Sequence, residues 1–244
     1  MRALRILLVV VAILGVLFVI ADRLAVNFAE NEAADKVRSS EGLADTPDVS
    51  IHGFPFLTQV MGGELDDVEI GIKDYLAPTG DGARTIRIDD IEAHMKGVEF
   101  SGDYSSATAK TATGTATIGY DELLKAAKNE PTRVMPGVTA KVVGLSDGGN
   151  GKVRMKVDVT VRGTSLSRTV SVLSSVTVQG DTVRVHADSL PDVGIQIAED
   201  AARSVTDFEQ KIEQLPGGVK LESVRAAKDG VEISVRGSNV RLAG

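Results

Sequence analysis

The strongest constraint on this chain lies at its N-terminus. Arg2 and Arg5 precede an uncharged run at 6–21 (ILLVVVAILGVLFVIA), and Asp22 and Arg23 follow it. A basic start, an apolar middle and a polar end are typical of an export signal. We therefore expect the remainder of the chain to lie outside the cytoplasm, on the outer side of the plasma membrane.

Two fates of this segment are open. As a helix, 16 residues would reach about 24 Å at about 1.5 Å per residue, against a hydrocarbon core of about 30 Å. Ala21 ends the run in a small residue suited to cleavage. Against cleavage, a helical pattern continues through Leu24, Phe28 and Val37. We expect residues 1–23 to be a retained signal anchor, with a cleaved signal peptide as the alternative.

Composition limits what the remaining residues, 24–244, can do. The chain has a net charge of −7, and the N-terminal segment itself holds three Arg and one Asp, so the remainder is more acidic still. Nucleic-acid binding needs clustered Lys and Arg, and is therefore not expected. The absence of Cys excludes disulfides, thiolate catalysis and cysteine metal sites. The hydrophobic content of 43% predicts a globular, ordered domain.

A strict alternation at 152–162 predicts the clearest β-strand. Lysine, arginine and other polar residues fill the even positions, and the odd positions are apolar. This pattern is typical of an antiparallel sheet with one buried and one wet face. The buried positions would be Val153, Met155, Val157, Val159 and Val161.

Other segments add strands and helices. Residues 169–178 and 182–187 predict a hairpin, and 121–128 predict a short helix. The Thr-rich stretch 105–117 is compatible with an edge strand or a loop. Residues 195–215 predict a long amphipathic helix whose apolar stripe is Ala201, Val205, Phe208, Ile212 and Leu215.

These elements predict one α+β domain over residues 24–244. We expect a single curved antiparallel sheet wrapped around long amphipathic helices, preceded by the N-terminal apolar helix.

No group of residues specifies an enzyme. The three histidines are scattered, and His186 with Asp188 at a strand end is the single suggestive pair. The Gly-rich stretch 148–151 lacks the G-x-x-x-x-G-K-[ST] pattern of a phosphate loop, and no Ser stands in a G-x-S-x-G turn. We therefore expect no catalytic residue, no metal site and no cofactor.

One segment is unusually apolar and aromatic, at 53–63 (GFPFLTQVMGG). Pro55 favours an extended Phe54, which would place Phe54 and Phe56 on one face. Such a segment between glycines suits the lip of a hydrophobic pocket or an element that touches a membrane. The alternative is an ordinary buried corner between a strand and a turn.

Several motifs together resemble the LmeA-like family of actinobacterial envelope proteins. The resemblance rests on the apolar leader, the Asp22-Arg23-Leu24-Ala25 helix start, Val49-x-Ile51-x-GFPFLTQ and Gly63-x-Leu65-x-x-Val68-x-Ile70. Near the C-terminus, Leu215-Pro-Gly-Gly-Val219-x-Leu221 and Gly230-Val-Glu-Ile233-x-Val235-x-Gly237 also fit. The resemblance covers essentially the whole chain, and GFPFLTQ is its most specific part.

The resemblance implies phospholipid binding and a link to the making of envelope lipoglycans. It also implies a fold like the tubular lipid-binding proteins related to bactericidal permeability-increasing protein, in which a curved sheet wraps a long helix beside an apolar groove. It carries no catalytic residue over to this chain.

We therefore expect a non-enzymatic, membrane-associated phospholipid-binding protein that buries acyl chains between sheet and helix. The rival hypothesis is a scaffolding ectodomain that binds an envelope protein or glycan, and an envelope enzyme is a third. The lipid-lining residues expected at the mouth, on the sheet and on the C-terminal helix are Phe54, Phe56, Leu57, Val60, Met61, Val153, Met155, Val157, Val205, Phe208 and Ile212.

Overall fold

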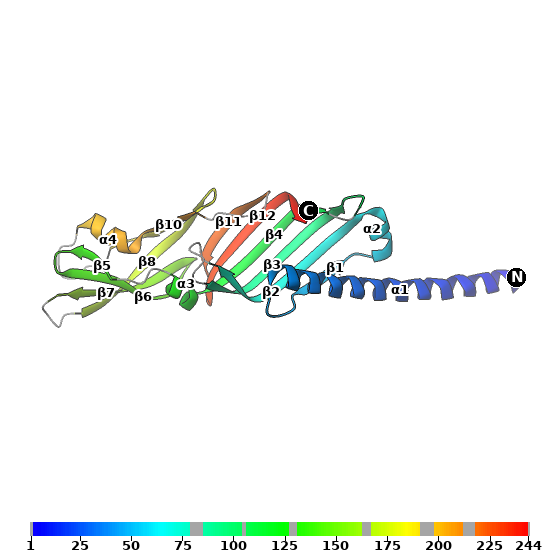
Figure 1. The fold of residues 1–244 in the computed structure, drawn as a ribbon, viewed down its shortest axis with the longest axis horizontal. Helices are drawn as coiled ribbons and strands as arrows, with labels where there is room; N and C mark the ends of the chain where they lie inside the picture. Colours follow the sequence, from blue (N-terminus) through cyan, green and yellow to red (C-terminus); the bar gives the residue numbers. More distant parts are fainter. Residues whose placement is uncertain are drawn as a thin grey trace. The chain divides into compact units, whose positions relative to one another are not determined.

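The computed structural model describes residues 2–78, 85–103, 106–126, 131–162, 167–190, 198–211 and 218–243. Its elements in chain order (Figure 1) are α1 (Arg2–Glu41), β1 (Asp48–His52), α2 (Phe56–Gly62), β2 (Glu64–Pro78), β3 (Thr85–Phe100), β4 (Ala107–Gly119), α3 (Tyr120–Ala126), β5 (Thr132–Met135), β6 (Val138–Gly149), β7 (Lys152–Val161), β8 (Ser167–Gln179), β9 (Thr182–Ala187), α4 (Glu199–Thr206), β10 (Phe208–Lys211), β11 (Val219–Ala226) and β12 (Gly230–Ala243).

The strands form two curled six-stranded sheets, where the sequence predicted a single sheet. The strand orders are β1-β2-β3-β4-β12-β11 and β10-β9-β8-β7-β6-β5 (Figure 1). Consecutive strands from β5 to β9 pair antiparallel through short connections, as expected for strands with one apolar face. The Thr-rich stretch left open by the sequence is strand β4, which pairs with β3 and β12 and so is not an edge. The α+β class is confirmed.

The chain divides into two compact units, each with its own core. Unit 1 comprises 1–72, 92–113 and 237–244, and unit 2 comprises 73–91 and 114–236. The buried core of unit 1 is Val26, Phe56, Leu65, Met95, Val98 and Ala109.

The second half of α1 packs on unit 1 through small side chains. Val26 and Ala34 are buried, and Ala25 and Ala29 pack against the same core. Because alanine side chains are short, the helix axis comes close to the strands. Leu24 and Phe28 face solvent. The predicted continuation of the helix beyond the apolar run is confirmed, since α1 extends to Glu41.

The alternation at β7 is confirmed and produces the largest core, in unit 2. Val153, Met155, Val157 and Val159 are buried, and they cluster with Val172 of β8. Tyr120, at the start of α3, joins this cluster while its hydroxyl donates a 2.7 Å hydrogen bond to the Ala227 carbonyl. Burial, aided by the nearby Asp147 carboxylate, raises the pKa of the Tyr120 hydroxyl to about 12.

The prediction of a long helix at 195–215 is wrong for the part after Thr206 that the structure describes. Helix α4 ends at Thr206, Asp207 is extended, and β10 then pairs with β9, with Phe208 opposite Val185. The free edge of β9 offers a row of backbone hydrogen bonds that a helix cannot use, and this pairing overrides the local helical pattern. Ile212 and Leu215 lie outside the described residues.

The burial pattern of β7 generates a stability prediction. Val157→Ser removes buried methyl groups and places a hydroxyl in an apolar core, so it should lower the free energy of unfolding by about 2–4 kcal/mol. The matched control is Thr160→Ser on the exposed face of the same strand, which should change it by less than about 0.5 kcal/mol. Urea denaturation measures both, and equal effects would contradict the inward orientation of Val157.

Candidate functional site

The first half of α1 lies outside the packed part of unit 1. Residues 2–21 are all exposed, and the helix is long and apolar enough to cross a membrane by length and composition. The exposed run continues without a break into the part of α1 that packs on the sheet (Figure 1). The N-terminal helix therefore fits a membrane anchor or a signal sequence.

Asp22 is the first buried residue after this apolar run. Its side chain is fully buried, its Oδ1 accepts a 2.9 Å hydrogen bond from the Leu57 N–H, and its Oδ2 accepts one of 2.7 Å from Arg23. Leu57 lies in the first turn of α2, and Pro55 at the N-cap offers no side-chain hydrogen bond. Asp22 therefore supplies from α1 the acceptor that the first turn of α2 lacks.

Arg23 makes a second set of contacts to the segment before α2. Its Nη2 lies 3.5 Å from the Gly53 carbonyl oxygen, and its guanidinium carbon lies 5.3 Å from the centroid of the Phe54 ring. Gly53 has φ +102°, a backbone conformation that side chains with a Cβ rarely adopt, so this position favours glycine. The exit of the apolar helix and the GFPFLTQ segment thus form one corner of unit 1.

The structure divides the segment 53–63 between core and surface. Phe56 is 7% exposed within the unit 1 core, whereas Phe54 is 57% and Met61 86% exposed. The prediction that Phe54 and Phe56 share a face is wrong, because α2 begins at Phe56 and the two-residue repeat of a strand does not apply there. Leu57 and Val60 are half-buried and pack against the core.

The remaining predicted lining residues belong to unit 2. Val153, Met155 and Val157 lie together on the inner face of β7, and Val205 of α4 packs against their cluster. Phe208 was expected on the same helical stripe as Val205, but it is 56% exposed on β10. The structure therefore packs Val205 against this cluster and leaves Phe208 exposed on the edge strand of the same sheet.

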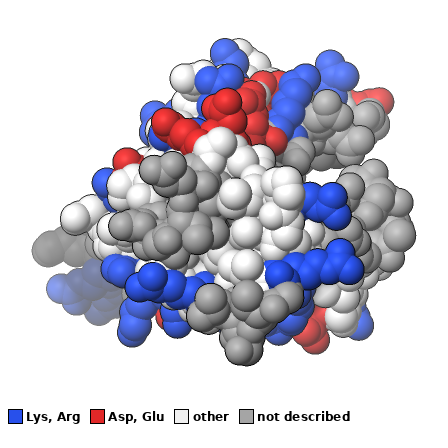
Figure 2. Space-filling view, turned by 90° about the vertical axis from the view of Figure 1, so that its left-hand side faces the viewer, with Lys and Arg blue, Asp and Glu red and all other residues white. Residues whose placement is uncertain are grey.

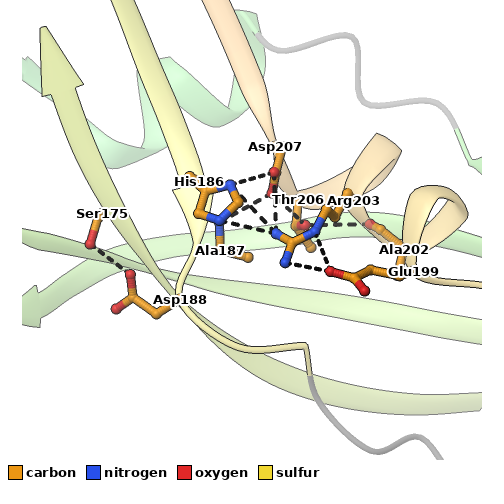
Figure 3. Close-up of polar contacts among 9 residues, drawn as sticks. All are labelled: Ser175, His186, Ala187, Asp188, Glu199, Ala202, Arg203, Thr206 and Asp207. Atoms are coloured by element: carbon orange, nitrogen blue, oxygen red, sulfur yellow. Dashed lines mark hydrogen bonds and ion pairs between the residues drawn. The ribbon is translucent and has the colours of Figure 1, made fainter.

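A polar network ties the end of α4 to β9 (Figure 3). Asp207 Oδ2 accepts a 2.7 Å hydrogen bond from His186 Nδ1, and its Oδ1 accepts bonds from the Ala187 N–H at 3.1 Å and the Thr206 hydroxyl at 3.0 Å. Arg203 bridges Glu199 at 2.7 Å and Asp207 at 3.4 Å. This network holds α4 in place, because it joins one helix end to a strand edge.

His186 and Asp188 hydrogen-bond to different partners. Figure 3 shows Asp188 turned toward Ser175, whose hydroxyl donates to it at 2.6 Å, and Lys152 pairs with Asp188 at 2.7 Å. The His186 side chain is 59% exposed, as expected for a strand histidine at the surface. Within the described ranges, no group of three or more histidine and carboxylate side chains is placed to hold a metal ion.

An open depression of about 350 Å³ lies beside this network. Its lining residues are Arg184, Val185, His186, Asp207, Phe208 and Glu209. Arg184 pairs with Glu209 at 3.2 Å. The arginine of this depression is therefore already neutralised, which disfavours it as a phosphate site.

The Asp22 contact generates a prediction for unit 1. Asp22→Ala removes the acceptor for the Leu57 N–H, so the melting temperature should fall and protease cleavage within 53–63 should accelerate. Asp22→Asn keeps an oxygen acceptor and should lie between this variant and the unmodified chain. Asp35→Ala, an exposed position on α1, is the control. If Asp35→Ala and Asp22→Ala have the same melting temperature, the Asp22 contact does not organise the corner.

The Asp207 network predicts a pH dependence of stability. Burial raises the pKa of the Asp207 carboxyl, but hydrogen bonds from Ala187, Thr206 and His186 outweigh it and hold that pKa below 3.8. A carboxyl with a lowered folded-state pKa stabilises the fold above its unfolded pKa, and this contribution disappears as pH falls through the folded value.

The free energy of unfolding should therefore fall from about pH 5 toward about pH 3, and Asp207→Asn should flatten this slope. Chemical denaturation at each pH measures the effect. Asp200→Asn on the exposed side of α4 serves as control, and a slope unchanged in Asp207→Asn would exclude the network as its source.

Comparison with known proteins supports lipid as the ligand class. The family described as LmeA-like phospholipid-binding matches residues 20–236. No curated protein and no solved structure matches the chain. The matched range begins within α1, just before Asp22, and reaches into β12.

The sequence interpretation missed the role of Asp22, which it used to mark the end of the apolar run and as part of a family motif. The sequence did carry a signal for this contact. A carboxylate directly follows the apolar run, and an aromatic segment with a proline at a helix start lies further along the chain.

Proposed function

The chain belongs to the LmeA-like phospholipid-binding family, and on that basis we propose that it binds phospholipid as an exported protein of the cell envelope. The apolar N-terminal helix supports attachment to a membrane. We place both units, as part of the proposal, on the extracytoplasmic face of the plasma membrane. We extend the proposal to a supporting role in envelope lipoglycan or lipid metabolism. The family description is one of binding, which supports a non-catalytic role.

The inner face of the second sheet is the proposed acyl-chain surface. Val153, Met155 and Val157 present a continuous apolar row there, and Val205 of α4 faces it. Each sheltered methylene contributes about 0.8 kcal/mol, so about ten of them would offset much of the cost of leaving a bilayer. Apolar burial of this kind requires few polar contacts to the ligand. The tubular arrangement implied by the family resemblance would place a groove beside such a surface.

Helix α4 covers part of this face, beside α3 and β11, and would have to move for a chain to enter there. It contacts β5 and β6 near one edge of the second sheet and β9 near the other, so it bridges the curled sheet. The Asp207 network is its anchor on β9. If α4 is the entrance, Asp207→Asn should take up an acyl-chain probe faster than Asp200→Asn, and equal rates would exclude this route.

The surface at this end of unit 2 suits a lipid head group at the rim. Figure 2 shows uncharged residues in the middle of the face, with Lys and Arg side chains below, at the sides and above it, and Asp and Glu mainly above. An ion pair between an exposed side chain and a charged head group would contribute little to the binding free energy, about 0–1 kcal/mol. We therefore assign most of the binding free energy to acyl burial.

Native mass spectrometry of the full chain tests the proposal. The released protein should carry adducts with the mass of one or two phospholipids, and binding of a fluorescent fatty-acyl probe should change little between low and high salt. A scaffolding ectodomain would carry no such adduct. A steep loss of probe binding with salt would point to head-group electrostatics instead of acyl burial.

A further inference from the structure

Exposed apolar side chains gather where α1 leaves unit 1. Leu24 is 66%, Phe28 72%, Phe54 57% and Met61 86% exposed. Single exposed apolar residues are common on protein surfaces, but four large ones near the exit of an apolar helix, two on α1 and two in the segment 53–63, indicate a contact site. We name these four residues the apolar collar.

The collar lies within a short distance of the apolar run along one continuous helix. Leu24 and Phe28 come three and seven residues after Ala21, which is about 5 and 10 Å at about 1.5 Å per residue. The head-group region on each side of a bilayer is about 5–8 Å thick. If the run 6–21 fills the hydrocarbon core, Leu24 lies within this interfacial region and Phe28 lies just beyond it.

Phe54, just before α2, and Met61, within α2, lie near the same interfacial level as Leu24. Phe54 lies against Arg23, and α2 is held to Asp22 through the Leu57 N–H. A helix of seven residues is about 10 Å long, so Met61 lies within about that distance of the exit. Figure 1 shows α2 at the end of the unit 1 sheet beyond which only α1 continues.

Arg23 completes the chemistry of an interfacial site. Its guanidinium pairs with Asp22 at 2.7 Å, lies over the Phe54 ring, and is itself 46% exposed. Long basic side chains with an apolar stem and aromatic rings are enriched at the level of lipid head groups, because one end of each is apolar and the other tolerates water.

We propose that the apolar collar inserts into the interfacial region of the membrane that α1 crosses, on the side occupied by unit 1. The partner is a lipid surface, because Leu24 and Phe28 follow the exposed apolar run of α1 within two helical turns. The inference rests on the proposed membrane attachment and goes beyond it. A helix alone permits unit 1 to tilt and swivel, whereas a second contact through α2 fixes its orientation on the bilayer.

The chain contains no Trp, so a single introduced Trp reports its own environment. The full chain carrying Phe54→Trp or Met61→Trp is reconstituted into phosphatidylcholine vesicles with and without brominated acyl chains. Both variants should show blue-shifted emission and lose intensity in the brominated vesicles. Met61→Trp guards against misfolding, because its side chain is almost fully exposed.

Two controls separate this proposal from membrane attachment itself. Ile13→Trp lies inside the apolar run and should be quenched most, and Lys36→Trp lies on the same helix about 22 Å beyond Ala21 and should stay unquenched. If Ile13→Trp is quenched while both collar variants behave like Lys36→Trp, the collar proposal is overturned and attachment stands. If Ile13→Trp is unquenched, attachment itself fails. Blue-shifted but unquenched collar emission would indicate contact with protein, and would also overturn the proposal.

Discussion

The buried carboxylate of Asp22 is the contact on which the corner of unit 1 formed by α1 and α2 depends. It is the point where an exposed apolar helix becomes a packed one. By accepting the Leu57 N–H at 2.9 Å, it fixes α2 against α1, and α2 in turn buries Phe56 while leaving Phe54 at the surface. Burying a carboxylate costs free energy unless hydrogen bonds compensate the lost hydration. The two hydrogen bonds that Asp22 accepts provide this compensation, and they depend on the local fold. The candidate membrane corner is thus organised by polar geometry, although its surface is apolar.

Unit 2 rests on a different constraint, the one-sided strands. Val153, Met155 and Val157 are buried because their alternation with polar residues leaves one orientation that hides them. The curl of the sheet then lets α4 contact strands near both edges and cover part of that face. Asp207 holds the cover through a backbone N–H on β9, which explains why a helix with few apolar residues remains in place. Stability and the proposed entrance for lipid therefore involve the same few contacts.

The two units suit different parts of the proposed lipid-binding function. Unit 1 carries the apolar helix and the collar, which suit attachment and orientation at a bilayer. Unit 2 carries the larger apolar core, which suits the sheltering of acyl chains. In neither unit do the described side chains assemble a metal site. Binding by apolar burial needs no such chemistry, in keeping with the family description.

The sequence by itself determined the features that depend on local pattern. The apolar run at 6–21, the alternation of β7 and the family motifs follow from neighbouring residues, because helix and strand periods are properties of short segments. The tertiary structure alone decided the burial of Phe56 against the exposure of Phe54, the capping of α2 by Asp22, and the conversion of Phe208 from helix to strand. Each of these depends on a partner distant in sequence, whose hydrogen bonds outweigh the local preference.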